Sequence, residues 1–240
     1  MPTSETFESR ILACTDEVLA WNKPPGLATT GRTMEDRHCA QGWAIAHEGR
    51  TVWAIHQLDR HTSGIVLFAR KKSVVGHWQR LWHQGRVKKY YLALVHGRLK
   101  SPTVTIDAPL KKSAERGRTA VAIRAEGKPA KTHVEELSSS GAYSSVMARP
   151  LTGRTHQLRV HLQSAGCPLI GERQYNSIPC GHHRRHCLHA FALICDASPP
   201  MDQIVAPFPD DLREVAERMR IDLGPLTNLY PSASYDHQAE

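Results

Sequence analysis

The feature that most constrains the fold is a series of four short β-type segments in the middle of the chain. Each segment is rich in β-branched or other strand-forming residues, and glycine, proline or serine separates it from the next. Short strands divided by such turn residues typically form hairpins, in which neighbouring strands run antiparallel. We therefore expect a mainly antiparallel sheet here, built from residues 103–106, 119–123, 132–137 and 143–148.

Further apolar segments on either side of this region also have the length and composition of strands. Residues 65–69 are apolar throughout, which is typical of a strand that is buried on both faces. The other expected strands are shorter or less uniform, and they cover residues 18–21, 52–55, 90–95 and 191–195.

Helical patterns are fewer than strand patterns. Thr33 and Asp36 resemble a capping box and indicate the start of a helix that runs to about Gly49. Three further helices are expected over residues 73–85, over residues 155–165 and from residue 210 onward. Strands and helices alternate without a regular βαβ order, so the predicted fold class is α+β.

The chain has 240 residues, which is long enough for one sizeable core. No repeat and no Gly/Ser/Pro-rich linker divides it. We therefore expect one compact domain over residues 11–221, with flexible segments over residues 1–10 and 222–240.

The charge balance indicates the kind of partner. Lys and Arg total 31 against 23 Asp and Glu, which gives a net charge of +8. Such a basic chain favours a polyanion, although charge alone does not separate RNA from DNA or acidic lipid. No apolar run approaches the roughly 20 residues of a membrane-spanning helix, and the first residues do not resemble a signal peptide. We expect a cytoplasmic protein whose six cysteines stay reduced and are mostly buried.

A polar segment lies between two of the expected strands. Residues 56–64 read His-Gln-Leu-Asp-Arg-His-Thr-Ser-Gly, and the apolar strand follows directly. Polar side chains in such a place suggest a cleft. A purely structural alternative is a turn in which Asp59 accepts hydrogen bonds from the Thr62 and Ser63 amides.

A second polar cluster occupies residues 152–161, Thr-Gly-Arg-Thr-His-Gln-Leu-Arg-Val-His. It places many hydrogen-bond donors on the first turns of an expected helix. The alternative interpretation is a solvated basic face that binds RNA phosphate without specificity.

Together, these clusters and the segments around them resemble the RluA family of pseudouridine synthases. The resemblance covers roughly residues 11–212, and the order and spacing of its motifs both match. The motifs are NKPPGL at 22–27, HxLDxxTSG at 56–64, KKYY at 88–91, GRTHQLRVH at 153–161, PLIGERQY at 168–175 and LHA at 188–190. It implies the pseudouridine synthase fold, with a mixed, mostly antiparallel central sheet, flanking helices and a central catalytic cleft.

The same resemblance implies an isomerase that converts uridine within structured RNA to pseudouridine. The bond from N1 to C1′ breaks, the uracil turns, and C5 joins C1′, without a cofactor or metal. The chain is similar to the short single-domain members of the RluA or TruC type, so residues 11–221 would be the catalytic domain. We expect a monomer that acts on a compact stem-loop of tRNA or rRNA.

The resemblance also implies roles for three residues. Asp59 falls on the catalytic aspartate, which acts as a nucleophile when ionised. Arg159 falls on the arginine that pairs with it, and Tyr91 on the tyrosine that stacks on the target base. Attack at C1′, addition to C6 and a glycal route all remain open.

Other residues of these motifs are expected to bind the substrate. One departure concerns Gln57, where the family most often has an arginine that helps fill the gap left by the flipped uridine. Gln57 can donate and accept hydrogen bonds but brings no charge. The expected substrate-binding residues are His56, Gln57, Leu58, Arg60, Thr62, Ser63, Gly64, Lys88, Lys89, Arg154, His156, Gln157 and His161.

Residues 180–189 hold two cysteines and four histidines but lack the paired spacing of a structural zinc site. We therefore expect a solvated basic loop there, and no metal. Basic residues elsewhere are better candidates for phosphate contacts. They are Arg70, Lys71, Lys72, Arg86, Lys88, Lys89, Lys111, Lys112, Arg116 and Arg118.

Two other functions are compatible with parts of the pattern. A catalytically silent RNA-binding protein or RNA chaperone could have the same fold, but binding alone requires none of Asp59, Tyr91 and Arg159. A metal-dependent RNA hydrolase would need paired carboxylates or a spaced His/Asp group near the motifs, and the sequence has neither.

Overall fold

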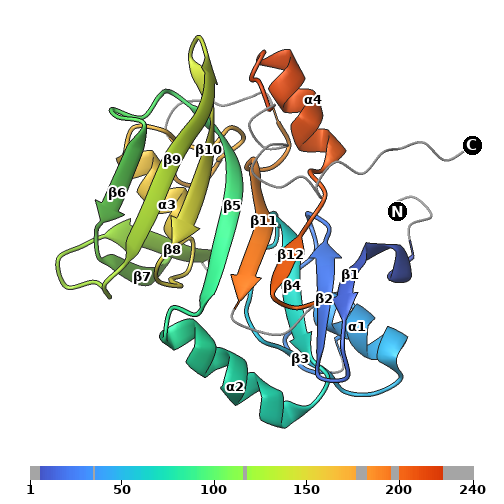
Figure 1. Cartoon of the computed structure of the whole chain (residues 1–240). Helices are drawn as coiled ribbons and strands as arrows, with labels where there is room; N and C mark the ends of the chain where they lie inside the picture. Colours follow the sequence, from blue (N-terminus) through green and yellow to red (C-terminus); the bar gives the residue numbers. More distant parts are fainter. Residues whose placement is uncertain (1–5, 35, 116–117, 177–182, 196–199, 224–240) are drawn as a thin grey trace, which may run out of the picture. The chain divides into compact units, whose positions relative to one another are not determined.

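A computed structural model describes residues 6–34, 36–115, 118–176, 183–195 and 200–223 (Figure 1). It divides the chain into two compact units. The first comprises residues 1–89 and 190–207, and the second comprises residues 90–189 and 208–240. Two strands, β5 (Val87–His96) and β11 (Leu188–Cys195), contribute residues to both units.

The first unit is built on a sheet with the strand order β1-β2-β4-β11. The strand β3 also pairs with β4, and β12 pairs with β11. The pairs β1–β2, β2–β4, β3–β4 and β11–β12 are antiparallel. These strands are β1 (Ile11–Cys14), β2 (Val18–Lys23), β3 (Trp53–Ala54), β4 (Ser63–Ala69) and β12 (Gln203–Val205).

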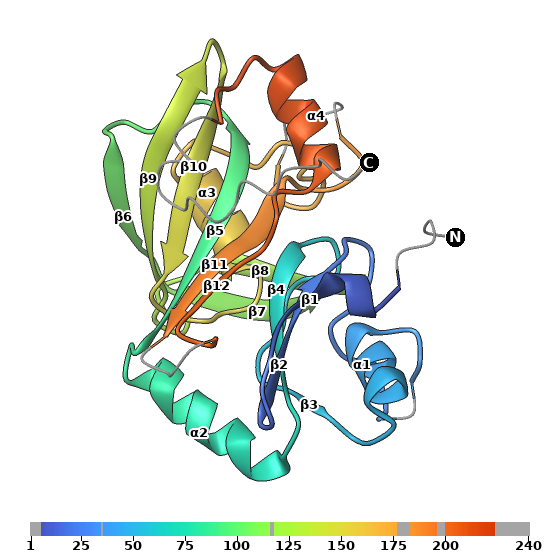
Figure 2. The same cartoon turned by 45° about the vertical axis from the view of Figure 1, so that its right-hand side comes forward.

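Two helices and a short 3₁₀ turn complete the first unit (Figures 1 and 2). The helix α2 (Lys72–His83) buries Val74, Trp78 and Leu81 in the same apolar cluster as Ile65 and Leu67 of β4. This is the apolar stripe that the helical spacing predicts. The other elements are η1 (Glu8–Arg10) and α1 (Ala40–Glu48).

The N-terminal residues that the structure describes pack against the sheet. The ring of Phe7 stacks on Trp21 of β2 at 4.6 Å between ring centres, and the Trp21 indole donates to the Phe7 carbonyl at 2.9 Å. Residues 1–5 and 224–240, for which we expected flexibility, lie outside the described residues.

The second unit contains the predicted run of antiparallel strands. Its strands follow the order β5-β10-β9-β6, and β7 pairs with β8 in a separate two-stranded sheet (Figure 1). Every one of these pairings is antiparallel. The strands are β6 (Thr103–Asp107), β7 (Leu110–Glu115), β8 (Arg118–Ile123), β9 (Lys131–Ser140) and β10 (Tyr143–Pro150).

Each helix of the second unit has its own apolar cluster. The helix α3 (Gln157–Ser164) contributes Val160 to a cluster with Leu110 of β7 and Val121 of β8. The helix α4 (Asp210–Arg218) buries Leu212, Val215 and Ala216 against another cluster. The predicted α+β class and mostly antiparallel sheet are therefore confirmed, whereas the single domain over residues 11–221 stays a prediction.

The start of α1 was wrongly expected near Thr33. The helix begins at Ala40, because the sulfur of Cys39 caps it by accepting the Gly42 amide at 3.3 Å. The Asp36 carboxylate instead accepts the amides of His38 and Arg32, and so closes a turn before the helix. The predicted end at Gly49 is correct, since this residue adopts φ +64°.

The interpretation of residues 183–189 as a solvated loop was also wrong. The Arg185 side chain is only 5% exposed, and its Nε and Nη2 donate to the two carboxylate oxygens of Asp211 at 2.7 and 2.9 Å. His183 lies 3.2 Å from the same carboxylate, and His189 is fully buried. The Asp211 carboxylate, 26 residues along the chain, provides the partner that makes burial of the Arg185 guanidinium possible, and no local pattern indicates this pairing. Residues 180–182 lie outside the described part.

Candidate active site

Residues 56–64, which we call the Asp59 loop, lie between β3 and β4 in the first unit and include the first two residues of β4. The Thr62 amide donates to the Asp59 carbonyl at 3.0 Å, so the chain turns at Arg60 and His61. Asp59 itself is half-buried, while Leu58, Thr62 and Ser63 are buried. The loop thus presents its aspartate from a largely buried backbone.

A buried lysine holds this loop against the preceding one. Lys23, at the end of β2, has no exposed surface, and its ammonium donates to three backbone carbonyls. These belong to Pro24 at 3.0 Å, Leu27 at 2.7 Å and Arg60 at 3.2 Å. A buried ammonium requires such acceptors, so Lys23 fixes the backbone immediately after Asp59. The sequence analysis did not single out this residue.

Gly26 and Arg60 join the same two loops a second time. The Gly26 amide donates to the Arg60 carbonyl at 2.9 Å, and the Arg60 Nε donates to the Gly26 carbonyl at 2.8 Å. Arg60 is otherwise exposed. Its guanidinium is therefore oriented at one edge, and the NKPPGL motif serves as a support for the Asp59 loop.

Threonine side chains fix the first half of the loop. The buried Thr29 hydroxyl donates to the Leu58 carbonyl and accepts the Leu58 amide, both at 3.0 Å. The exposed Gln57 donates from Nε2 to the Thr30 hydroxyl at 3.2 Å. Both backbone groups of the residue before Asp59 are thus satisfied by one side chain.

Gly64, the second residue of β4, cannot carry a side chain. Its φ is +106°, and a Cβ atom there would lie 2.2 Å from the carbonyl oxygen of Ala190 in β11. The close approach of these two strands therefore requires the glycine of the TSG motif.

His56 and Lys89 lie at the other end of the loop. The Leu67 amide donates to His56 Nε2 at 3.2 Å, and burial together with the Lys89 charge lowers the His56 pKa to about 3. The Lys89 ammonium lies 4.8 Å from the centre of the Trp82 ring, and burial lowers its pKa to about 8. His56 is therefore neutral near pH 7. Lys88, which precedes Lys89 in the chain, is exposed.

Tyr91 and Arg159 belong to the second unit. Tyr91 is 8% exposed and lies on β5, opposite Ala148 of β10. Arg159 lies in the first turn of α3 and is also 8% exposed. Since Asp59 belongs to the first unit, the association of these three residues stays a prediction.

A buried carboxylate orients Arg159. The Arg159 Nε donates to Glu172 Oε2 at 2.7 Å, and its Nη2 donates to Glu172 Oε1 at 2.9 Å. Burial alone would raise the Glu172 pKa, but the hydrogen bonds and charge of Arg159 lower it overall, aided by the Gln174 amide. This two-point contact fixes the plane of the guanidinium. Glu172 lies within the PLIGERQY motif but was not among the predicted site residues.

Tyr175 and His156 extend this arrangement, and we call Arg159, Glu172, Gln174 and Tyr175 the Arg159 cluster. The Arg159 guanidinium lies 4.9 Å from the centre of the Tyr175 ring. The Tyr175 hydroxyl is hydrogen-bonded to the Nδ1 of His156, which caps α3 with a left-handed φ of +52°. A non-glycine residue in this conformation is strained, so its contacts must stabilise it.

Gln157 and His161 support the structure from within. Gln157 is buried, and its side chain bonds the Thr152 hydroxyl, the Arg154 amide and the Lys131 carbonyl at 2.8 to 3.0 Å. His161 is fully buried between the Thr132 hydroxyl and the Ala108 carbonyl. Gln157 thus holds the loop before α3 to its surroundings, and His161 ties α3 to Thr132 and Ala108. The RNA contact expected of both residues stays a prediction. Arg154 is exposed, as expected of a binding residue.

Two of the residues expected to contact phosphate can be compared directly. Arg70 pairs with Glu48 at 2.8 Å and donates to the Thr15 carbonyl at 2.7 Å, so its charge is used within the protein. The Lys112 side chain has no ion pair or hydrogen bond within the described chain. Across the described residues, no group of three or more His, Cys, Asp or Glu side chains is placed to hold a metal ion.

Comparisons with known proteins identify the family of the chain. Residues 17–164 match the family model described as RNA pseudouridylate synthase. The chain is 34% identical over 215 residues to "Ribosomal large subunit pseudouridine synthase C" of Vibrio vulnificus (strain CMCP6), covering 85% of this chain and 67% of that protein. It is 32% identical over 217 residues to the protein of the same name from Escherichia coli O157:H7, covering 85% and 68%.

Solved structures show the same fold. "Human RNA Pseudouridylate Synthase Domain Containing 4" superposes with a TM-score of 0.72 at 23% identity, covering 89% of this chain and 94% of that one. "Human RNA Pseudouridylate Synthase Domain Containing 1" gives a TM-score of 0.65 at 26% identity, with coverage of 88% and 94%. No described helix has the length and apolar character required to span a membrane. The chain therefore belongs to the RluA-type family of RNA pseudouridine synthases, enzymes that isomerise uridine in RNA to pseudouridine.

Proposed function

We propose that this enzyme isomerises uridine in large-subunit ribosomal RNA, with Asp59 as its catalytic nucleophile. The observation that carries the assignment of Asp59 is its place on a loop that Lys23 and Thr29 hold by its backbone. The RNA is proposed from the names of the relatives, which are large-subunit enzymes. Work on ribosomal RNA also supports a cytoplasmic location.

Asp59 acts on a uridine that has left the base stack, because its glycosidic bond is inaccessible within stacked RNA. The N1–C1′ bond breaks, a bond from C5 to C1′ forms, C5 loses a proton and N1 gains one. The reaction is therefore balanced without an external reagent. Attack at C1′, addition to C6 and a glycal route each require an ionised carboxylate at Asp59.

Arg159 and Tyr91 complete the proposed site. Arg159 pairs with the ionised Asp59, and Tyr91 stacks on the target base and handles the C5 proton. Glu172 is a positioning residue in this proposal, because it fixes the guanidinium that faces the reaction. Its two hydrogen bonds use the Nε and Nη2 edge of Arg159, so the group approaches Asp59 in a defined plane.

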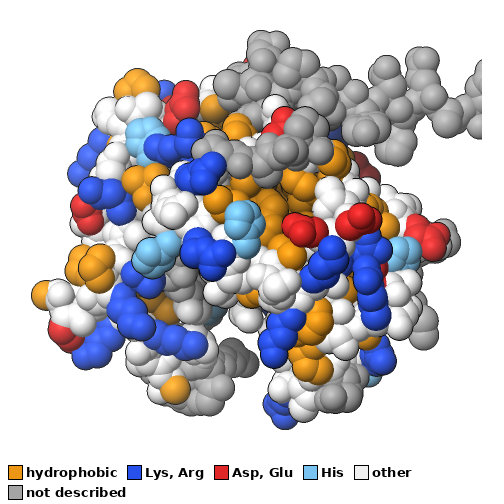
Figure 3. All heavy atoms as spheres, turned by 60° about the horizontal axis from the view of Figure 1, so that its bottom comes forward, with side chains coloured by type: hydrophobic (Ala, Val, Ile, Leu, Met, Phe, Trp, Pro, Cys, Tyr) orange, Lys and Arg blue, Asp and Glu red, His pale blue; other side chains and the backbone are white. Residues whose placement is uncertain are grey.

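The distribution of cationic side chains favours RNA as the substrate. The net charge is +8, and Lys and Arg side chains are numerous on the surface shown in Figure 3, where acidic side chains are fewer. Exposed Arg60, Lys88 and Arg154 are available for phosphate contacts.

Tritium release tests the proposal. Wild-type protein and Asp59→Asn are incubated in EDTA with ribosomal RNA labelled with C5-tritiated uridine, and nucleosides are then analysed by mass spectrometry. Wild type is expected to release tritium and form pseudouridine, whereas Asp59→Asn should do neither. Release by Asp59→Asn would contradict the role of Asp59, and binding without any release by wild type would favour a silent RNA-binding protein.

The RNA target is tested separately. Pseudouridines are mapped in ribosomal and transfer RNA from a strain with and without the gene. Loss of a pseudouridine from large-subunit ribosomal RNA supports the proposed substrate, whereas losses confined to transfer RNA would replace it.

A further inference from the structure

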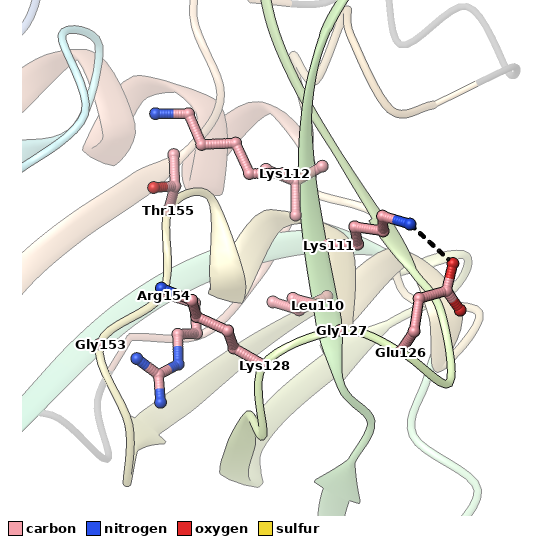
Figure 4. A pocket seen from close by; sticks show the side chains of 10 residues that line it. Leu110, Lys111, Lys112, Glu126, Gly127, Lys128, Gly153, Arg154 and Thr155 are labelled. Atoms are coloured by element: carbon pink, nitrogen blue, oxygen red, sulfur yellow. Dashed lines mark hydrogen bonds and ion pairs between the residues drawn. The ribbon is translucent and has the colours of Figure 1, made fainter.

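A basic cavity in the second unit is lined by residues outside the Asp59 loop and the Arg159 cluster. It has a volume of about 410 Å³ and lies between the β7–β8 hairpin, the turn at residues 124–128 and the loop at residues 152–155 (Figure 4). We call it the hairpin pocket. This volume is within the range of small-ligand sites and is large enough for one nucleotide.

The inner part of the hairpin pocket is apolar. Leu110 and Val121 are 4% and 5% exposed and belong to the cluster that packs on α3. The rim consists of cationic and polar groups, with Lys112, Lys128 and Thr155 around the opening. An apolar floor beneath a cationic rim fits the two parts of a nucleotide, its base or ribose and its phosphate.

Most of the positive charge in the pocket is uncompensated. Glu126 is the acidic residue of the lining, and its carboxylate is bound to Lys111 at 2.9 Å. Lys112 and Lys128 are exposed and have no ion pair within the described part of the protein. The Arg154 Nε donates to the Pro129 carbonyl at 3.0 Å, which orients this guanidinium beside the turn. Three cationic groups therefore remain for an anion.

The turn that carries Lys128 is fixed in place. The amides and carbonyls of Leu110 and Lys128 form two reciprocal hydrogen bonds, each 2.9 Å long. A Cβ atom on Gly127 would lie 2.6 Å from the Leu110 backbone, so only glycine permits this approach. The pocket wall is thus built by backbone contacts and does not depend on a bound ligand.

We propose that the hairpin pocket binds a nucleotide of the RNA substrate other than the target uridine. This inference rests on the proposed function. The loop at residues 152–155 leads directly into α3, which carries Arg159. The five residues from Thr155 to Arg159 end in a helix and span at most about 14 Å. This distance is the length of roughly four stacked nucleotides. The pocket therefore takes a nucleotide close to the target in the same strand, or its pairing partner.

Gly153 provides a sharp test of this assignment. It lines the pocket, and a Cβ atom there would meet no atom within 4 Å, so a side chain can be added without a clash. Gly153→Asp places a carboxylate in the pocket, and Gly153→Asn places a neutral side chain of the same shape. We expect Gly153→Asp to raise the RNA Kd and KM about tenfold over Gly153→Asn, with the same kcat at saturation.

Removal of a cation provides a second measurement. Lys128→Ala is compared with Lys100→Ala, which removes an exposed lysine outside the pocket. Lys128→Ala should weaken RNA binding and reduce the slope of log Kd against log salt by about 0.7 to 0.9, whereas Lys100→Ala should keep the slope. The probe in each case is the labelled ribosomal RNA, with its binding followed by filter retention.

The outcomes separate this inference from the proposed function. If wild type forms pseudouridine but Gly153→Asp and Gly153→Asn have equal Kd values for the RNA, the pocket assignment alone is overturned. Absence of pseudouridine with wild type would overturn the proposed function, while the Kd comparison would still decide the pocket. Saturable binding of uridine monophosphate at micromolar concentration, with RNA binding unaffected by Gly153→Asp, would indicate a metabolite site and also overturn the assignment.

Discussion

The Asp59 loop and the Arg159 cluster each present one charged side chain, but they fix it by different means. In the loop, a buried ammonium and a hydroxyl bond the backbone on either side of Asp59. In the cluster, a buried carboxylate bonds the charged group of Arg159 itself. The first arrangement sets where a residue lies, and the second sets the orientation and charge of its functional group.

This difference has an energetic consequence. The carbonyls that surround Lys23 are neutral, so loss of this lysine leaves those of Pro24 and Leu27 without its ammonium, whereas the Arg60 carbonyl keeps the Gly26 amide. The pair of Arg159 and Glu172 instead balances two buried charges, so loss of either leaves the other unpaired. The loop should therefore respond to mutation mainly through stability, and the cluster through both stability and catalysis.

Lys23→Met is expected to have the largest effect on stability. It removes the three charge-assisted hydrogen bonds of a fully buried ammonium and leaves three part-buried carbonyls without this donor. We expect a loss of about 3 to 4 kcal/mol in the free energy of unfolding. Chemical denaturation measures this value, with Lys88→Met as an exposed control that should change by less than about 0.5 kcal/mol. Equal values for the two variants would show that Lys23 does not support the loop.

Glu172→Gln is expected to have the next largest effect. The amide preserves the shape but removes the charge that compensates Arg159, so the free energy of unfolding should fall by about 2 to 3 kcal/mol. Loss of guanidinium orientation should also lower kcat about tenfold or more, with little change in KM.

Two variants control for a purely structural effect of Glu172. Glu172→Asp keeps the charge and should recover part of kcat, and replacement of the exposed Glu214 of α4 by glutamine should change neither kcat nor the free energy of unfolding. Because the Glu172 pKa is lowered on folding, its stabilisation is present above about pH 4.5 and is lost as the pH falls below that value. A kcat that does not distinguish Gln from Asp at this position would contradict the positioning role.

The sequence predicted the functional residues of these two regions better than their supports. Asp59 and Arg159 lie in contiguous motifs whose residue types can be recognised in one dimension. Lys23 and Glu172 act through contacts with groups 37 and 13 residues away. A lysine at a strand end and a glutamate in a loop are most often solvated, so local patterns assign them no role.

The same limit applies to the fold: elements with a clear local pattern were predicted, and elements that depend on distant contacts were not. The strands over residues 103–106, 119–123, 132–137 and 143–148 were found because their side chains are β-branched and their turns are marked. The strand β7 was missed because its sequence Leu-Lys-Lys-Ser-Ala-Glu is polar, and only its pairing with β8 makes it a strand. The helix α1 was extended too far because Asp36 has the type of a capping residue but bonds a turn instead.

His56→Gln tests the loop through acid stability. Burial, with the nearby Lys89 charge, lowers the His56 pKa to about 3. The unfolded chain therefore binds a proton at His56 as the pH falls through about 6.5, whereas the folded protein binds it only near pH 3. The stabilisation is therefore complete above about pH 6.5 and declines as the pH falls toward 3, by roughly 1 to 2 kcal/mol between pH 7 and 5. Glutamine can accept the Leu67 amide without titrating. The difference in unfolding free energy between wild type and variant should therefore change with pH in this window, and a constant difference would contradict the buried neutral histidine.

Gln57→Arg is expected to have the smallest effect and to concern binding alone. Gln57 is exposed at the edge of the Asp59 loop and bonds only the Thr30 hydroxyl within the described residues. An arginine there adds a phosphate contact, which should steepen the slope of log Kd against log salt by about 0.7 to 0.9. The free energy of unfolding should change by less than about 0.5 kcal/mol, because no buried group loses a partner.

Thr30→Val is the matched control, since it removes the same hydrogen bond without adding charge. An inactive Gln57→Arg enzyme with intact stability would show that the glutamine itself contributes to the reaction, and the loop would then act through more than the position of Asp59.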